Sequence, residues 1–176
     1  MKKLVYLAVI LSAAFLTSCS VNKKFVPRAC NTINTVRFDE LNFKRNDYTI
    51  LKNVTAEAVV VYETDLFGGS ISISEQNNEF SIEFRKSRKD QWVANKFNGI
   101  AYFGYLSNDY GDMALNLDPD YYSRHIAFYR LINQCRVAGG DALIEPTVST
   151  NVEEQGRKIV FKTTVTAKVV KINTDK

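Results

Sequence analysis

The chain has 176 residues, a formal net charge of +4 at pH 7, 45% hydrophobic residues and 12% aromatic residues. This length fits one ordinary domain that can bury its own core, and the weak charge gives no signature of nucleic-acid binding. Only three residues are prolines, and β-branched residues are dense in the second half of the chain. We therefore expect sheet to be the dominant structure.

The N-terminus combines Met1-Lys2-Lys3 with an apolar run at residues 4–16 that ends in Leu16-Thr17-Ser18-Cys19. This run is too short to span a bilayer, which needs about 20 apolar residues, and is typical of a secretion signal. The last four residues resemble the lipobox of bacterial lipoproteins. The resemblance implies that residues 1–18 are a cleaved signal peptide and that lipid on Cys19 attaches the protein to a membrane. The alternative is an ordinary cleaved signal with a chance cysteine.

The residues after Cys19 indicate where such a lipoprotein would reside. Ser20 stands where an aspartate would retain a lipoprotein at the inner membrane, so the same resemblance implies the outer membrane. No acidic cluster follows Cys19 to direct the protein to the cell surface. We expect a lipid-anchored protein that faces the periplasm.

The segment at residues 19–35 mixes polar, basic and proline residues without periodicity, so we expect a lipid-anchored tether there and a single domain at residues 36–176. Cys30 and Cys135 form an even pair in an oxidising compartment. They could join in a disulfide that closes a loop of about 105 residues. Alternatively, Cys135 is a buried free thiol and Cys30 an incidental residue of a linker, and the sequence does not decide between these possibilities.

The first half of the domain predicts several strands. Residues 48–62 contain a turn-like Lys52-Asn53 pair and then an apolar run that suits a central strand buried on both faces. Apolar residues alternate with polar ones at residues 71–73 and 80–84, on either side of Gln76-Asn77-Asn78, which predicts a β-hairpin. A further strand is expected at residues 99–106.

The second half predicts one helix and two strands. Asp118-Pro119 predicts a helix start, because the carboxylate can cap exposed amides and proline fits the first helical position, and Gly139-Gly140 predicts its end near residue 138. Strands are expected at residues 142–150 and 158–172. The whole chain predicts an α+β fold: a mostly antiparallel sheet packed on one main helix, with a β-α-β-β core and an inserted β-hairpin region.

Four segments together resemble a known small domain: the strand at residues 48–62, the capped helix, Ala138-Gly139-Gly140-Asp141-Ala142-Leu143-Ile144, and Thr166-Ala167-Lys168-Val169-Val170. They are similar to the β-α-β-β domain of the Rcs stress-sensing outer-membrane lipoproteins and of the YbjQ-type family, which is associated with heavy-metal binding. The resemblance covers residues 48–62 and 121–172 and leaves the hairpin region as an insertion. It implies an envelope lipoprotein that acts through protein contacts, and we carry over no metal function.

The polar residues that could carry chemistry form no recognisable set. His125 is the only histidine, and no serine or cysteine stands in a nucleophile context, so we expect a surface or packing role for it. The spacing of Asp109, Asp112, Asp118 and Asp120 does not match a calcium-binding EF-hand loop, and a solvated loop is the simpler interpretation. We predict no enzyme activity, no cofactor and no metal site.

A basic run precedes the only tryptophan of the chain. Arg85, Lys86, Arg88 and Lys89 stand just before Trp92, and we expect them at a loop tip. They could contact anionic headgroups, lipopolysaccharide phosphates or an acidic partner. The alternative is a solvated turn that discourages edge pairing between sheets.

These observations predict a non-catalytic envelope lipoprotein that serves as an interaction or sensing module, with the membrane and an envelope protein as its partners. The sequence does not predict the oligomeric state. The alternative is a ligand-binding lipoprotein for a glycan or a lipid that uses the aromatic residues of the insertion, which could instead belong to the core. A hydrolase with two facing carboxylates is a third hypothesis. The aromatic residues in question are Phe97, Tyr102, Phe103, Tyr105 and Tyr110.

Overall fold

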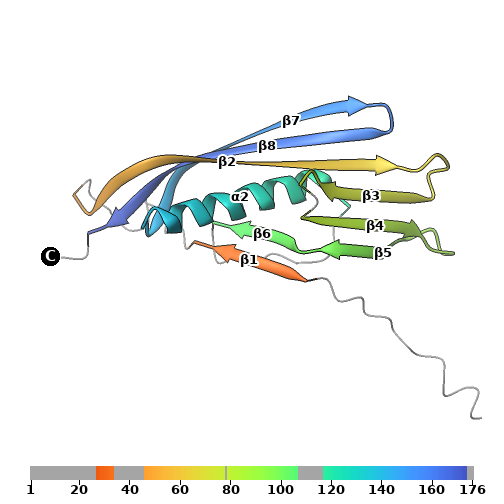
Figure 1. Cartoon of the computed structure of the whole chain (residues 1–176), viewed down its shortest axis with the longest axis horizontal. Coiled ribbons are helices and arrows are strands. Elements are labelled where there is room, and N and C mark those ends of the chain that lie inside the picture. The colour runs from red at the N-terminus through yellow and green to blue at the C-terminus, as the bar shows by residue number, and fades with distance from the viewer. Residues whose placement is uncertain (1–26, 34–45, 78, 107–116, 174–176) are drawn as a thin grey trace, which may run out of the picture.

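The computed structural model describes residues 27–33, 46–77, 79–106 and 117–173 (Figure 1). The predicted signal peptide, Cys19, Asp109, Tyr110 and Asp112 lie outside these ranges. Within them, no helix combines the length and the apolar character that a membrane span requires. The elements in chain order are β1 (Arg28–Thr32), β2 (Tyr48–Thr64), β3 (Ser70–Glu75), β4 (Phe80–Lys86), β5 (Trp92–Gly99), β6 (Ala101–Tyr105), α2 (Pro119–Val137), β7 (Ala142–Gln155) and β8 (Lys158–Ile172).

The strands form a large antiparallel sheet and a small parallel pair. The large sheet has six strands in the order β5-β4-β3-β2-β8-β7, and β1 pairs with β6 in parallel. The predicted α+β class and the mostly antiparallel sheet with one helix are therefore confirmed for the described residues. The predicted β-α-β-β core is not confirmed, because β6, the strand before the helix, pairs with β1 outside the large sheet.

Strand β2 lies inside the sheet between β3 and β8, as the sequence predicts. The prediction that both of its faces are buried is wrong, because residues 54–60 alternate between buried and more exposed positions. Val54, Ala56, Ala58 and Val60 face the interior, and the residues between them lie on the opposite face. The predicted turn near Lys52 is a register shift within a continuous strand.

The predicted hairpin is confirmed as β3 and β4, which pair in antiparallel register. Strand β5 was not predicted, because its sequence WVANKFNG has no clean alternation and a register shift between Glu83 and Phe84 interrupts its pairing with β4. Strand β1 was not predicted either. It occupies residues 28–32, within the segment that was predicted to be the tether.

The helix has the boundaries that its capping residues predict. Asp118 is the N-cap and accepts a hydrogen bond from the Asp120 amide at 3.0 Å, and Pro119 is the first helical residue. Gly139 follows the helix at a φ of +71°, a conformation in which other residues are strained. Strands β7 and β8 then follow, and β7 runs five residues beyond the predicted end at Thr150.

Helix α2 lies between two layers, with β2 and β8 on one side and β6 on the other (Figure 1). On the β6 side the approach is so close that a Cβ atom on Gly104 would lie 2.1 Å from the Tyr129 amide nitrogen. Buried residues of the helix therefore face both layers, among them Tyr122, Ile126, Leu131 and Ile132. The helix and the inner faces of both layers share one hydrophobic core.

Polar contacts fix the helix in this position. Arg130 donates to the Glu57 carbonyl at 2.7 Å and forms ion pairs with the carboxylates of Glu75 at 3.0 Å and Glu79 at 2.9 Å. The Glu75 side chain is only 1% exposed, so Arg130 neutralises a carboxylate that would otherwise be costly to bury. On the other side, Asn31 of β1 donates to the Tyr129 carbonyl at 3.2 Å, which attaches β1 to the helix.

Candidate functional site

Three turns meet at one end of the large sheet (Figure 1). We call this end the sheet tip and define it as residues 63–70, 83–92 and 156–158. The Thr64 amide donates to the Arg157 carbonyl at 3.4 Å, which joins the β2–β3 turn to the β7–β8 turn. The Lys86 amide donates to the Gly69 carbonyl at 3.3 Å, which joins the end of β4 to the β2–β3 turn. Segments far apart in the sequence therefore form one continuous surface.

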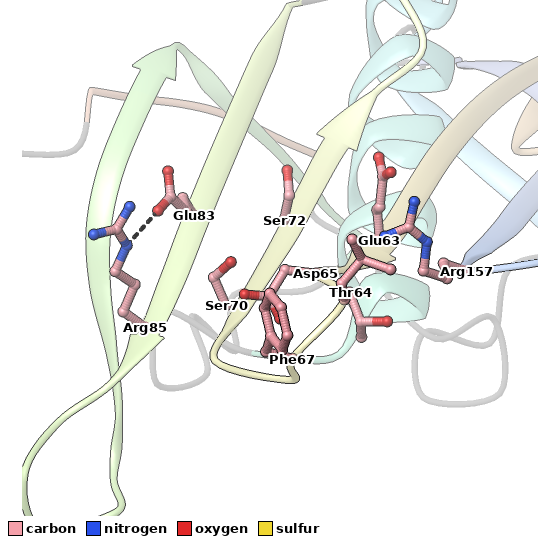
Figure 2. A pocket seen from close by; sticks show the side chains of 10 residues that line it. Glu63, Thr64, Asp65, Phe67, Ser70, Ser72, Glu83, Arg85 and Arg157 are labelled. Atoms are coloured by element: carbon pink, nitrogen blue, oxygen red, sulfur yellow. Dashed lines mark hydrogen bonds and ion pairs between the residues drawn. The ribbon is translucent and has the colours of Figure 1, made fainter.

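The sheet tip contains an open depression of about 530 Å³. Figure 2 shows Glu63 and Arg157 on one side of it and Glu83 and Arg85 on the other. Charged groups of both signs, two serine hydroxyls and an aromatic ring thus surround the same space. The lining residues are Glu63, Thr64, Asp65, Leu66, Phe67, Ser70, Ser72, Glu83, Arg85 and Arg157.

The carboxylates of the depression are engaged with neighbouring groups. Arg85 donates to Glu83 at 2.7 Å, and this hydrogen bond is the main cause that lowers the pKa of the Glu83 carboxyl. Desolvation raises the pKa of the Asp65 carboxyl, but hydrogen bonds from Ser70 and Gly69 outweigh it and lower that pKa. Lys158 pairs with Glu63 at 3.4 Å. The carboxylates of Glu63, Asp65 and Glu83 therefore serve internal contacts of the tip.

Two large apolar side chains project from the β2–β3 turn. Leu66 is 74% exposed and Phe67 is 94% exposed. The turn is closed by the Asp65 carboxylate, which accepts a hydrogen bond from the Gly69 amide at 2.8 Å. An ordered turn that presents adjacent apolar side chains to solvent is a candidate contact surface. Leu66 and Phe67 were not predicted as a contact surface, although a Leu-Phe pair directly before Gly68-Gly69 is visible in the sequence.

The predicted basic run divides between a strand and a turn. Arg85 and Lys86 are the last residues of β4, whereas Arg88 and Lys89 belong to the β4–β5 turn. Lys86 pairs with Asp90 at 3.0 Å and lies over the ring of Trp92, 5.6 Å from its centroid.

The remaining two cations of the run, Arg88 and Lys89, are exposed, and within the described residues neither forms an ion pair. Their positive charges can therefore contact an anionic partner.

The two cysteines of the domain differ in environment. Cys30 is an exposed free thiol on β1, and Cys135 is a buried free thiol on the helix. The Cys135 sulfur donates to the Ala142 carbonyl at 3.7 Å, and burial raises the pKa of this thiol. The structure thus has no disulfide between Cys30 and Cys135.

His125 is packed among aromatic rings on the β6 side of the helix. Its Nδ1 lies 3.0 Å from the Gly104 carbonyl oxygen, and its ring centroid lies 4.2 Å from that of Tyr121 and 4.8 Å from that of Tyr105. Burial lowers the pKa of His125, and the hydrogen bond to Gly104 opposes that shift.

Four of the aromatic residues proposed as a ligand surface fall within the described residues. Phe103 and Tyr105 are buried, and Phe103 lies 6.2 Å from Tyr122 of the helix between ring centroids. Tyr102 packs on Tyr129 at 4.8 Å, and Phe97 stacks on Phe80 at 6.5 Å. These rings contribute to the core and the helix interface.

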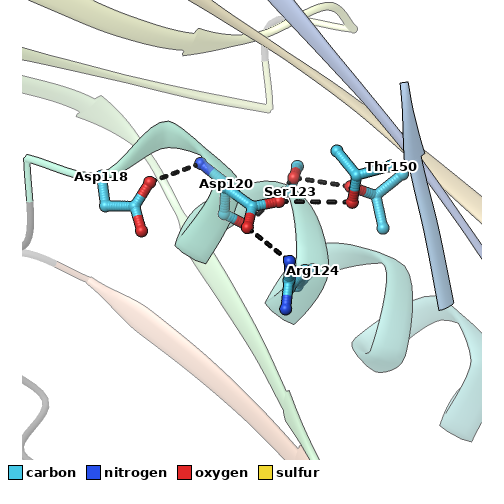
Figure 3. A network of polar contacts seen from close by, with 6 residues as sticks. Asp118, Asp120, Ser123, Arg124 and Thr150 are labelled. Atoms are coloured by element: carbon cyan, nitrogen blue, oxygen red, sulfur yellow. Dashed lines mark hydrogen bonds and ion pairs between the residues drawn. The ribbon is translucent and has the colours of Figure 1, made fainter. Parts of the chain in front are cut away.

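The helix N-terminus carries a polar network (Figure 3). Ser123 and Thr163 share a hydrogen bond of 2.7 Å, Thr150 contacts Thr163 at 3.0 Å, and Thr150 donates to Asp120 at 3.3 Å. Arg124 pairs with Asp120 at 2.7 Å. Ser123 and Thr163 are fully buried, so the network joins the helix to β7 and β8, and the hydroxyls of these two residues are closed to solvent.

Within the described ranges, no three side chains among His, Cys, Asp and Glu lie close enough to hold a metal ion together. Asp118 and Asp120, two of the four aspartates considered from sequence, serve the helix start. Comparison of the chain with family models, curated proteins and solved structures finds no match.

Proposed function

We propose that the protein is an outer-membrane lipoprotein, anchored through Cys19 and facing the periplasm, that works as a non-catalytic interaction module. The observation that carries the interaction role is the free edge of β7. Among the described strands, β7 pairs only with β8, so its other edge offers unpaired backbone groups. Such an edge is a template for a strand from another protein.

The composition of β7 leaves this edge open. Proteins usually protect long edge strands with proline, charged side chains (lysine above all) or irregular backbone. In β7, proline and irregular backbone occur only near the start of the strand, at Pro146 and at the register shift between Ile144 and Thr147. Residues 147–152 contain no proline and no charged side chain, and all of them except Thr150 are exposed.

The side chains of β7 indicate what kind of segment would bind there. Val148 is 43% exposed and Val152 is 51% exposed, and they are four residues apart, so they project to the same face. Glu153 and Glu154 add negative charge at the far end. An extended segment of an envelope protein, with apolar residues at alternate positions and a basic residue near one end, fits this surface.

Crosslinking in intact cells tests the interaction. A photo-crosslinking residue at Asn151 should capture an envelope protein, whereas the same residue at Lys162 should not. Lys162 is the matched control because it is the register partner of Asn151 on the neighbouring, inner strand β8. Val148→Lys with Val152→Lys should reduce the capture at least about tenfold, since lysines on an edge oppose strand addition.

Capture at Lys162 to the same extent, or an Asn151 adduct only with a second copy of this chain, would contradict the proposed partner. The anchor is tested separately by metabolic labelling with a fatty acid. Cys19→Ala should lose the label, whereas Cys30→Ala should keep it, and a label that survives Cys19→Ala would rule out the anchor.

A further inference from the structure

We propose that the sheet tip docks on an anionic phospholipid surface, with Leu66 and Phe67 inserted among the headgroups and the neighbouring cations on lipid phosphates. Phe67 is almost completely exposed in a turn that its own hydrogen bonds hold in place. Aromatic and aliphatic side chains flanked by cations are the pattern by which protein surfaces enter a membrane interface.

The charges at the tip favour an anionic partner. Residues 85–92 contain four cations and one acid. Three of the four acids of the tip form ion pairs, Glu83 with Arg85, Glu63 with Lys158, and Asp90 with Lys86. The fourth, Asp65, accepts a hydrogen bond from the Gly69 amide. Arg88, Lys89 and Arg157 form no ion pair with any other described residue. Cations close to an anionic membrane each strengthen attachment.

The position of the predicted anchor agrees with this orientation, an argument that rests on the proposed function. Strand β1 begins at Arg28 beside Ala101, and the Ala101 amide donates to the Pro27 carbonyl at 3.0 Å. The eight residues of β5 separate this point from the tip, a distance of about 26 Å along the strand.

Cys19 precedes Pro27 by eight residues, which reach at most about 29 Å when fully extended. Figure 1 shows that the start of β1 points toward the same end of the molecule as the three turns. A lipid on Cys19 can therefore lie in the plane of the sheet tip. The tether length permits the tip to rest on the membrane that holds the anchor, and it limits how far the domain can move away.

Trp92 provides the measurement, because it is the only tryptophan and stands at the first residue of β5 beside the basic turn. The anchored full-length lipoprotein is reconstituted in vesicles with brominated acyl chains, either phosphatidylcholine alone or a mixture with phosphatidylglycerol. We expect Trp92 fluorescence to be quenched on the mixed vesicles and far less on phosphatidylcholine. High salt should reduce the quenching, since it screens exposed charges.

Two pairs of variants test the two components of the surface. Leu66→Ser with Phe67→Ser should lower the quenched fraction at least about fivefold, and Arg88→Glu with Lys89→Glu should do the same. The matched controls are Val137→Ser and Lys52→Glu, which alter an 88% exposed apolar residue at the C-terminus of the helix and an exposed lysine on β2. Both controls should keep the wild-type quenching.

The inference is overturned if Trp92 of the anchored protein is not quenched on the mixed vesicles. It is also overturned if Trp92 is quenched as strongly in the Leu66/Phe67 and Arg88/Lys89 double variants as in the wild type. A photo-crosslinking residue at Phe67 that captures protein and no lipid would also overturn it. Vesicle flotation separates these outcomes from failure of the anchor. A protein without lipid on Cys19 leaves the vesicle fraction after high-salt washing. A lipidated protein whose sheet tip does not bind the membrane stays in the vesicle fraction.

Discussion

The inner face of β2 and β8 is mainly apolar and the outer face mainly polar, although both faces are built from alternate residues of the same two strands. Inside, Val60 and Val165 are fully buried against the core. Outside, Lys162 pairs with Glu57 at 3.3 Å, and the hydroxyls of Thr55 and Thr166 contact each other at 3.0 Å. Burial of apolar surface therefore acts on one face, and cross-strand polar pairs act on the other.

The comparison shows where stability and register come from. A buried aliphatic side chain contributes about 1.5–3 kcal/mol, whereas an exposed ion pair contributes about 0–1 kcal/mol. The polar outer residues still help to fix the register between β2 and β8. A shift of one residue would bring the outer lysines into the core. We therefore expect inner-face changes to dominate unfolding, and outer-face changes to have small effects.

The largest effect is expected where the helix touches the β6 layer. Gly104→Val would place a side chain 2.1 Å from the Tyr129 amide nitrogen and 2.4 Å from the Phe128 carbonyl carbon, and these backbone atoms cannot move without displacing the helix. We expect the free energy of unfolding to fall by about 3 kcal/mol or more in urea denaturation.

Gly69→Ala is the control for that substitution. A Cβ atom there meets only the Asp65 carboxylate, at 3.6 Å, so we expect a change below about 0.5 kcal/mol. Equal stability of Gly104→Val and Gly69→Ala would show that the helix does not approach β6 as closely as the structure has it.

The second largest effect compares two isoleucines on strands. Ile73 on β3 is fully buried, and Ile50 on β2 is 50% exposed. Ile73→Ala should lower the free energy of unfolding by about 2–4 kcal/mol, and Ile50→Ala by less than about 1 kcal/mol. Urea denaturation of both variants gives the difference, and comparable losses would contradict the assignment of inner and outer positions.

Much of this fold could be predicted because local signals agree with the tertiary structure. Asp118-Pro119 and Gly139 define the helix by capping chemistry alone, and the alternation around the β3–β4 turn defines that hairpin. The apolar run in β2 misled the prediction, since Val59 and Val61 are valines on the outer face, and β-branched residues suit a strand whether buried or not. Strand β1 depends on long-range pairing with β6 and has no local signal.

The candidate site could be predicted only in part. The basic run at residues 85–89 was visible in the sequence, but its relation to Phe67 and Arg157 was not, because these residues come from three different turns. The core role of Phe103 was one of two open possibilities, and only the helix position decides it. Sequence patterns describe single elements, whereas a surface depends on how the elements meet.

A smaller effect concerns His125, which connects the helix to the inner side of β6. Its pKa in the folded protein is lowered from 6.5, mainly by burial, so the unfolded chain binds its proton more readily. The stability contributed by neutral His125 is present above about pH 6.5 and is lost as the pH falls through the lower folded-state pKa.

The free energy of unfolding, measured in urea between pH 7.5 and pH 5, should therefore fall more steeply for the wild type than for His125→Asn. Carboxylates also titrate over this range, but they are the same in both proteins, so the difference isolates the histidine. Parallel pH profiles would show that His125 is equally solvated in the folded and unfolded states.

The smallest effect is expected on the outer face. Lys162→Ala removes the ion pair with Glu57, whose two side chains are about half exposed. We expect the free energy of unfolding to change by less than about 0.5 kcal/mol, and the change to shrink in high salt, because water and ions already screen such a pair. A loss as large as that of Ile73→Ala, measured in the same urea series, would mean that the outer face is covered in solution. In that event the sheet would have two buried faces, and a partner on the polar side would have to be sought before one at the edge of β7.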